Sequence, residues 1–374
     1  MCDAARKFYF AVYKKLLDLN CVRSSVDYGL FSWYENGKLC GVLLSHVDDI
    51  LWAGSESFKL KVIEPFCKLF SVRSQSANCF KYLGLNITQR FNENCIYVDQ
   101  IEYVNNIEPI AVSNQRKKSK TDACNKDETS MFCKLVGKLN WVACQTRPDI
   151  AFDVCVLSSK MRSPIVENVL HANKVLSRIQ SNPLTLKYGN LGDLNKVKVL
   201  CYTDASLGNL ENGKSTEGYI VFLIGENNTV CPIVWKSKTI QRVVRSTLAA
   251  ESNALVDGLD EGFFVSFTFN EVISGVIDMK PLSRFRNISS SKLLPIVAFT
   301  DNSSVFNNLR STTMVAERRL CVDISAIKQM LENGEVTDVQ WVPSDKQLAD
   351  CLTKKGVNTI KLNAILESGK LMDF

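Results

Sequence analysis

The sequence predicts a mixed fold, α+β in its first half and α/β in its second. In the first half, short apolar strands joined by tight turns are followed by amphipathic helices. The second half, from residue 191 onward, has the element order β–β–β–α–β–α–β–α, which indicates a mixed sheet covered by helices. The 374 residues are enough for two or three domains that each bury a core.

The composition is that of an ordinary globular protein, with 46% hydrophobic and 22% charged residues. The formal net charge of +6 permits a nucleic-acid partner without requiring one. Fourteen cysteines are scattered without a CxxC pair, and there are only two histidines, so we expect core thiols in a reducing compartment rather than disulfides or zinc. No apolar run is long enough for a membrane span, and the start lacks a signal-peptide core. We therefore expect an intracellular protein of the cytoplasm or nucleus.

The first half opens with an amphipathic helix over 3–19 that begins abruptly, without a capping residue. An aromatic strand over 27–34 and a turn at 35–38 lead to the strand LCGVLLSHV, which runs into Asp48 and Asp49. Two interpretations of this Asp-Asp pair stay open. It is either a metal-binding hairpin tip or a polar turn between apolar strands.

The rest of the first half continues as short strands and then helices. Residues 113–130 are polar with a basic cluster, which favours a solvated loop over a phosphate contact; the cluster is Arg116, Lys117, Lys118 and Lys120. Chain breakers at Asn182-Pro183 and at 189–192 mark the domain boundary. The expected elements are a helix over 56–70, a hairpin from 79–89 and 95–98, a helix from 99, and helices over 131–145, 148–161 and 166–181.

The second half contains five expected strands and four expected helices. A long polar loop with Arg284 and Arg286 is expected over 280–292. The expected elements are strands 197–204, 217–225 and 229–236, helix 246–270, strand 293–300, helices 302–311 and 315–333, strand 336–342 and a final helix.

Four acids enter this second half from separate elements: Asp204, Glu251, Asp301 and Asp350. Asp204 ends the apolar run VKVLCYTD, and Asp301 ends LLPIVAFTD. Like charges that converge within a few ångströms repel unless a cation neutralises them. The pattern therefore predicts a two-metal site that cleaves phosphodiesters.

Nine motifs in a fixed order resemble the C-terminal part of the Pol polyprotein of copia-type (Ty1/copia) retrotransposons, a reverse transcriptase followed by a ribonuclease H. The resemblance covers essentially the whole chain. The motifs are DAARKFYF, HVDD, FKYLGLNI, LVGKLNWVACQTRPDIAFDV, YTDAS, WKSKTIQRVVRSTLAAE, AFTDN, ERRLCVDISAIKQML and WVPSDKQLADCLTK. The resemblance implies a truncated reverse-transcriptase palm and thumb, followed by a ribonuclease H-like mixed-sheet domain. The implied ranges are a partial palm over 1–110, a helical thumb or connection over 111–190, and the ribonuclease H-like domain over 191–374.

The resemblance places Asp48 and Asp49 on the Asp-Asp pair of the polymerase palm, as metal ligands. His46 stands where the family usually has a tyrosine. The family's third catalytic Asp lies upstream of the helix with which this sequence begins. Because a polymerase needs that carboxylate to hold two Mg²⁺ ions, we expect no RNA-directed DNA synthesis by this chain alone.

The ribonuclease H half matches its family without a gap. The resemblance implies that Asp204 bridges two ions, that Asp350 joins it on the ion that activates water, and that Glu251 and Asp301 hold the other. Carboxylates are the ligands that Mg²⁺ prefers, so Mg²⁺ is the expected cofactor, with Mn²⁺ as the second candidate. No histidine follows residue 171, so a histidine proton shuttle is not expected.

Residues near the acids suggest how nucleic acid is bound. Cations and hydroxyls precede the Glu251 helix, where phosphate would bind, and short polar side chains beside the acids could contact 2′-hydroxyls. For the short polar residues, roles as helix caps and turn formers are an equal alternative. The expected contact residues are Lys236, Lys238, Arg242, Arg245, Ser206 and Asn302. Asp323 and Glu317 are assigned to a solvated helix face.

Three functional hypotheses follow. The first is a ribonuclease H that cleaves the RNA strand of RNA–DNA hybrids, with that hybrid and the rest of a Pol polyprotein as partners and no membrane. The second is a catalytically silent retroelement remnant or a co-opted nucleic-acid-binding protein. The third, a transposase or resolvase on the same fold, is disfavoured by the polymerase-like first half. The sequence carries no signal for the oligomeric state.

Overall fold

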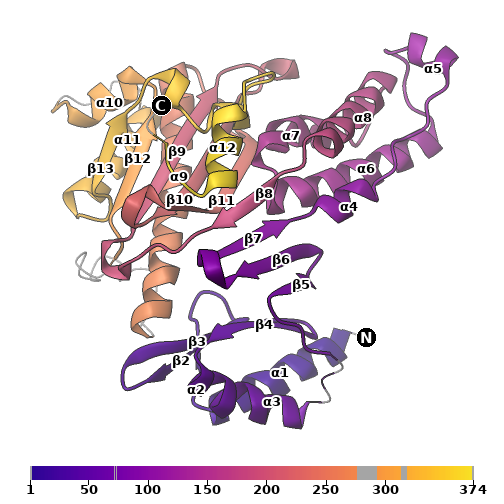
Figure 1. The fold of residues 1–374 in the computed structure, drawn as a ribbon. Helices are drawn as coiled ribbons and strands as arrows, with labels where there is room; N and C mark the ends of the chain where they lie inside the picture. Colours follow the sequence, from indigo (N-terminus) through magenta and orange to yellow (C-terminus); the bar gives the residue numbers. More distant parts are fainter. Residues whose placement is uncertain (1, 71, 73, 276–292, 313–317, 373–374) are drawn as a thin grey trace. The chain divides into compact units, whose positions relative to one another are not determined.

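The computed structural model describes residues 2–70, 72, 74–275, 293–312 and 318–372 (Figure 1). The chain packs as two compact units: residues 1–82 with 263–294, and residues 83–262 with 295–374. These units are defined by which residues pack against one another and are not a test of the predicted domains. The domain ranges predicted from the sequence therefore stay a prediction. The expected loop over 280–292 and Glu317 lie outside the described residues.

The first unit is built on a four-stranded antiparallel sheet in the order β1-β2-β3-β4. Asn36 and Gly37 both have positive φ, as the tight β2–β3 hairpin requires. A Cβ at Gly41 of β3 would lie 2.1 Å from Cγ of Phe58, so only glycine lets this ring pack against the sheet. The elements are α1 (Cys2–Asp18), β1 (Val22–Arg23), β2 (Leu30–Glu35), β3 (Lys38–His46), β4 (Asp49–Gly54), α2 (Glu56–Phe58), the π-helical turn η1 (Lys59–Ile63), α3 (Glu64–Leu69) and β5 (Cys79–Tyr82).

The last turns of α9 (Thr247–Ser274) also belong to this first unit. Glu271 is 3% exposed there, and its two carboxylate oxygens accept hydrogen bonds from the Ser24 hydroxyl at 2.5 Å and the Ser25 amide at 2.8 Å. The Tyr34 hydroxyl donates to the Val272 carbonyl at 2.7 Å. These contacts fasten the end of the helix to β1 and β2.

The second unit begins with a mostly helical part. Helices α6, α7 and α8 bury one apolar cluster that includes Phe132, Leu139, Leu157 and Leu176. Strands β6, β7 and β8 pair antiparallel. The elements are β6 (Leu85–Arg90), β7 (Cys95–Asp99), α4 (Ile101–Asn105), α5 (Asn114–Lys118), α6 (Lys126–Gln145), α7 (Ala151–Ser159), α8 (Val166–Ser181) and β8 (Thr185–Tyr188). Strand β8 lies between the two predicted chain breaks.

The polar segment 113–130 is mostly exposed, as its composition predicted, but only Ser113 and residues 119–125 lie outside the two helices that it contains. Ser113 caps α5, and Asn125 with Glu128 forms a capping box at the start of α6. Arg116 of the basic cluster donates to both oxygens of Glu128, each at 3.0 Å. Its polar residues therefore start helices and pair with one another.

The mixed sheet of the second unit has the strand order β11-β10-β9-β12-β13 (Figure 1). Strands β11, β10 and β9 are antiparallel, and β12 and β13 continue parallel to β9. This is the α and β order that the sequence predicted. The elements are β9 (Lys198–Ser206), β10 (Thr216–Ile224), β11 (Val230–Thr239), α9, β12 (Ile296–Thr300), α10 (Ser303–Arg310), α11 (Arg318–Glu332), β13 (Asp338–Trp341) and α12 (Ile360–Ser368).

The central strand β9 is buried on both faces, as its near-continuous apolar sequence requires. Cys201 and Thr203 face α9, and Leu200 and Tyr202 face a core shared with α12. Because side chains alternate along a strand, Asp204 lies on the same face as Leu200 and Tyr202. No described helix is both long and apolar enough to cross a membrane, and every described cysteine is a free thiol.

Candidate active site

Asp204 is completely buried near the end of β9. In the β9–β10 register it lies opposite Gly218. A Cβ at Gly218 would lie 2.5 Å from Cβ of Leu352, so the missing side chain lets the 3₁₀ turn η10 (Asp350–Leu352) pack against this point. The sheet thus brings Asp204 and the turn that carries Asp350 together.

Glu251 reaches the same place from α9. The Ser246 hydroxyl accepts a hydrogen bond from the Ala249 amide at the start of this helix. Gly258, two turns further on, lets the helix approach β9 closely, since a Cβ there would lie 2.5 Å from Cγ2 of Thr203. The helix therefore holds Glu251, which is 4% exposed, beside the end of the central strand.

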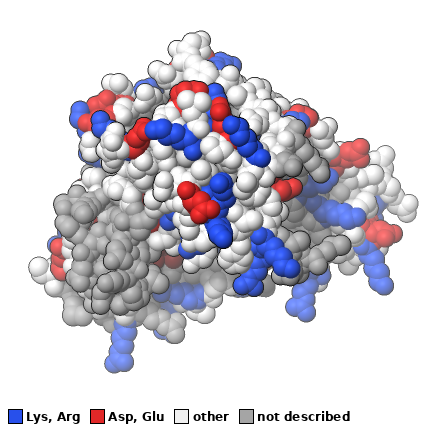
Figure 2. All heavy atoms as spheres, turned by 90° about the horizontal axis from the view of Figure 1, so that it is seen from below, with Lys and Arg blue, Asp and Glu red and all other residues white. Residues whose placement is uncertain are grey.

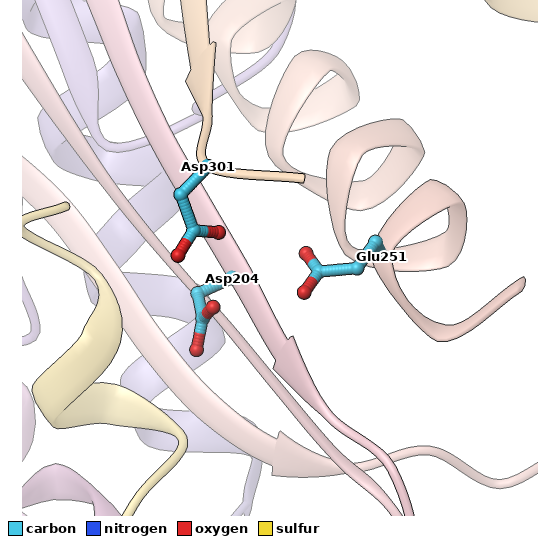
Figure 3. Close-up of side chains that lie close together, drawn as sticks. All are labelled: Asp204, Glu251 and Asp301. Atoms are coloured by element: carbon cyan, nitrogen blue, oxygen red, sulfur yellow. The ribbon is translucent and has the colours of Figure 1, made fainter. Parts of the chain in front are cut away.

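Asp301 follows β12 directly, next to β9 in the sheet. Its Oδ2 accepts a hydrogen bond from the Ser344 hydroxyl at 2.6 Å, and its carbonyl accepts one from the Trp341 indole at 2.9 Å. Ligand oxygens of Asp204, Glu251 and Asp301 all lie within 4.8 Å of one another. Figure 3 shows these three carboxylates pointing toward one another from β9, α9 and the end of β12.

Asp350, the fourth predicted acid, starts η10 rather than lying in the final helix. It is not part of the three-acid group, and its carboxylate forms an ion pair with Lys354. Lys354 Nζ also lies 3.4 Å from Asp204 Oδ1. The structure thus brings three of the four acids together directly and links the fourth to them through a lysine.

Sequence reasoning missed three residues that contact these acids: Ser344, Thr353 and Lys354. The Thr353 hydroxyl donates to Asp204 Oδ2. All three lie in the WVPSDKQLADCLTK motif that carries Asp350. Lys354 also follows Asp350 by four residues, the spacing of helical ion pairs, and this signal could have identified it.

Burial dominates the electrostatics of the cluster. Desolvation raises the pKa of Glu251, and the nearby charges of Asp204 and Asp301 raise it further. Desolvation also raises the pKa of Asp204, although Lys354 and Thr353 act in the opposite direction. Oε2 of Glu251 is buried and has no hydrogen-bond partner among the described residues. An unpartnered oxygen among converging carboxylates, all hard oxygen donors, fits a divalent cation such as Mg²⁺.

These raised pKa values predict a pH-dependent stability in the absence of divalent ions. Between the ordinary pKa of 4.5 and the higher folded-state pKa of Glu251, the folded chain holds a proton that the unfolded chain has lost. The free energy of unfolding therefore falls as the pH rises through this range, by up to about 1.4 kcal/mol per pH unit for each such proton. Thermal melts in EDTA from pH 5 to 8 measure this. The midpoint of Glu251→Gln should vary less with pH than that of the wild type, and an equally steep decline in both would contradict the assignment.

Asp48 and Asp49 lie at the β3–β4 turn of the first unit, where Asp49 pairs with His46 in the register. Both side chains are exposed. In the part of the chain that the structure describes, they join no group of three or more potential metal ligands. The assignment of Asp48 and Asp49 as metal ligands stays a prediction.

Several of the predicted nucleic-acid contacts are engaged within the protein. Lys238 pairs with Asp257 and lies 3.1 Å from Glu217, and Arg242 pairs with Asp323. The assignment of Asp323 to a solvated face is wrong, because its side chain is 15% exposed and bound to that arginine. Asn302 caps α10 by accepting from the Val305 amide at 3.0 Å, as the capping alternative predicted.

The remaining predicted contact residues are accessible. Lys236 and Arg245 are exposed, and Ser206 is half-buried at the end of β9. On the face drawn in Figure 2, Lys and Arg side chains are interspersed with Asp and Glu rather than joined into one basic surface. Their role in binding nucleic acid stays a prediction.

The mixed sheet and its helices agree with the predicted ribonuclease H-like fold, and the three acids converge where β9 and β12 end. Among solved structures, a ribonuclease H1 from Halobacterium salinarum is 18% identical and covers 42% of this chain and 94% of its own, with a TM-score of 0.29. The foamy viral protease–reverse transcriptase in complex with an RNA/DNA hybrid is 13% identical and covers 85% of this chain and 37% of its own, with a TM-score of 0.40.

The chain is similar to retrovirus-related Pol polyproteins of transposons over most of its length, which confirms the copia-type resemblance. The Pol polyprotein from transposon RE1 of Arabidopsis thaliana is 26% identical over 367 residues, which is 94% of this chain and 23% of that protein. The putative transposon Ty5-1 protein YCL074W of Saccharomyces cerevisiae is 30% identical over 213 residues, 53% of this chain and 66% of that protein. This chain thus spans about a quarter of the length of its Arabidopsis relative. No protein-family model matches it.

Proposed function

We propose that the chain hydrolyses the RNA strand of RNA–DNA hybrids by ribonuclease H-type, two-metal chemistry. The observation that carries the proposal is the convergence of Asp204, Glu251 and Asp301 within 4.8 Å at the strand ends of the mixed sheet. Asp350 lies at the edge of this cluster, next to Lys354. The similarity to transposon Pol polyproteins supports a nucleic-acid substrate.

In this proposal, Asp204, Glu251 and Asp301 would hold divalent cations, and Asp350 would complete the set. When bound, such cations would activate a water for in-line attack and neutralise the leaving 3′ oxygen. Ser344 and Thr353 orient the carboxylates of Asp301 and Asp204 by hydrogen bonds, so the ligands are held before substrate arrives. Lys236 and Arg245 are exposed and available to the phosphate backbone.

The substrate is proposed to be a hybrid rather than a DNA duplex. An RNA strand displays 2′-hydroxyls in a wide, shallow minor groove, and short hydrogen-bonding side chains can read them. Ser206, two residues after Asp204, is such a side chain and is half-buried at the end of β9.

The test is cleavage of an end-labelled RNA strand by the purified full chain. Hybrid, single-stranded RNA, double-stranded RNA and double-stranded DNA of one sequence are compared, each in Mg²⁺, Mn²⁺ and EDTA. We expect RNA cleavage in the hybrid alone and only with a divalent ion. Binding of the hybrid without metal-dependent cleavage would instead support the silent-remnant hypothesis.

A further inference from the structure

Lys354 places a positive charge inside the acid cluster. Its ammonium pairs with the Asp350 carboxylate and lies 3.4 Å from Asp204 Oδ1, while 38% of its side chain is exposed. The Lys354 ammonium thus contacts two of the proposed metal ligands.

The backbone holds Lys354 in this position. The carbonyl of the preceding residue, Thr353, accepts hydrogen bonds from the Thr216 hydroxyl at 2.9 Å and from the Asn209 amide at 2.7 Å. The Lys354 amide donates to the Asp350 carbonyl at 3.1 Å. Contacts from the β9–β10 connection and β10 thus fix the chain at the base of the lysine, and only its four-carbon stem is free to swing.

The acids are consequently divided into two groups that share Asp204. On one side, Asp204, Glu251 and Asp301 converge around the unpartnered Oε2 of Glu251. On the other side, Asp204 and Asp350 are bridged by Lys354. Among the described residues, Glu251 and Asp301 form no ion pair, whereas Asp204 and Asp350 already share the Lys354 ammonium.

We propose that Lys354 is a positioning residue that occupies the second cation position, so that a second divalent ion must displace it from Asp204 and Asp350. This inference rests on the proposed function and deepens it. The free chain then binds one divalent ion readily, at Asp204, Glu251 and Asp301. Binding of the second ion is weakened because this ion and the Lys354 ammonium compete for the carboxylate oxygens of Asp204 and Asp350. Until that ion arrives, Lys354 keeps Asp350 beside Asp204 and prevents repulsion between them.

The test is a calorimetric titration of Mn²⁺ into the metal-free full chain, with no substrate present. We expect the wild type to bind one ion with measurable affinity. Lys354→Met removes the charge and keeps the stem, and it should bind a second ion at least about tenfold more tightly than the wild type does. Lys354→Gln is a second neutral variant with the same expectation. Lys354→Arg keeps the charge and should titrate like the wild type.

The matched control is Lys355→Met, which makes the same change at the next, exposed residue and should leave the titration unchanged. Thermal melts establish that each variant is folded. The same preparations are assayed for hybrid cleavage, where the Mg²⁺ concentration for half-maximal rate should fall in Lys354→Met.

The two failures are distinguishable. If the wild type cleaves hybrid but folded Lys354→Met and Lys354→Gln bind Mn²⁺ as the wild type does, the inference on Lys354 is overturned and the proposed function stands. If the wild type neither binds Mn²⁺ nor cleaves hybrid, both are overturned. The inference is supported if Lys354→Met and Lys354→Gln bind a second Mn²⁺ ion more tightly than the wild type, and Lys354→Arg does not.

Discussion

Asp204→Asn is expected to lower Mg²⁺-dependent cleavage of the hybrid by at least about 10³-fold. Cations at such a site supply several kcal/mol of stabilisation to the charges that develop during hydrolysis, and each 1.36 kcal/mol is a factor of ten in rate. Asp204 belongs to both acid groups, with Glu251 and Asp301 on one side and Asp350 on the other. Its loss should therefore affect the whole site. Single-turnover cleavage rates of the two proteins measure the effect.

The control for this prediction is Asp345→Asn. Asp345 lies on the same connection as Ser344, but its side chain is 69% exposed and pairs with Lys361 outside the cluster. Its variant should cleave like the wild type. Because burial raises the pKa of Asp204, the neutral Asn should not lower the thermal midpoint in EDTA. Equal cleavage by folded Asp204→Asn and the wild type would dismiss the site.

Arg147→Met is expected to lower the free energy of unfolding by about 3–5 kcal/mol, since it leaves a buried carboxylate without its partner. Arg147 and Asp149 side chains are each 4% exposed, and the guanidinium donates to both carboxylate oxygens at 2.8 Å. It also donates to the Asn182 carbonyl at 2.7 Å, which ties α6 to the end of α8. Urea denaturation of the full chain measures the loss.

Arg162→Met is the matched control, because Arg162 is exposed and the substitution is the same. It should change the free energy of unfolding by less than about 0.5 kcal/mol. Residues 148–150 pack against η10, which carries Asp350, so Arg147→Met should also reduce hybrid cleavage. A loss of stability no larger than that of Arg162→Met would show that the Arg147–Asp149 pair does not hold this region together.

The sequence predicted the elements of the mixed sheet well because their signals are local. The apolar run before Asp204 is long enough to mark a central strand, and the run before Asp301 marks its neighbour. Once the strand order places these two strands side by side, their terminal acids must meet. The positions of Asp204, Glu251 and Asp301 therefore follow from the sequence pattern together with the family resemblance.

The interactions around the acids did not follow, because they join residues far apart in the chain. Arg242 was predicted to contact nucleic acid, but it pairs with Asp323, 81 residues away. Thr353 and Lys354 reach Asp204 across about 150 residues. Composition was also a poor guide at 113–130, where Ser113 and Asn125 cap two helices that flank a short loop. Capping residues and loop residues are the same chemical types, so composition alone cannot separate them.

The measurement that tests the central claim most directly is anomalous diffraction from crystals of the full chain soaked in Mn²⁺. The account predicts a manganese peak bounded by the carboxylates of Asp204, Glu251 and Asp301. A map with no peak at these three acids, in crystals that bind manganese at the Asp48–Asp49 turn or elsewhere, would contradict it.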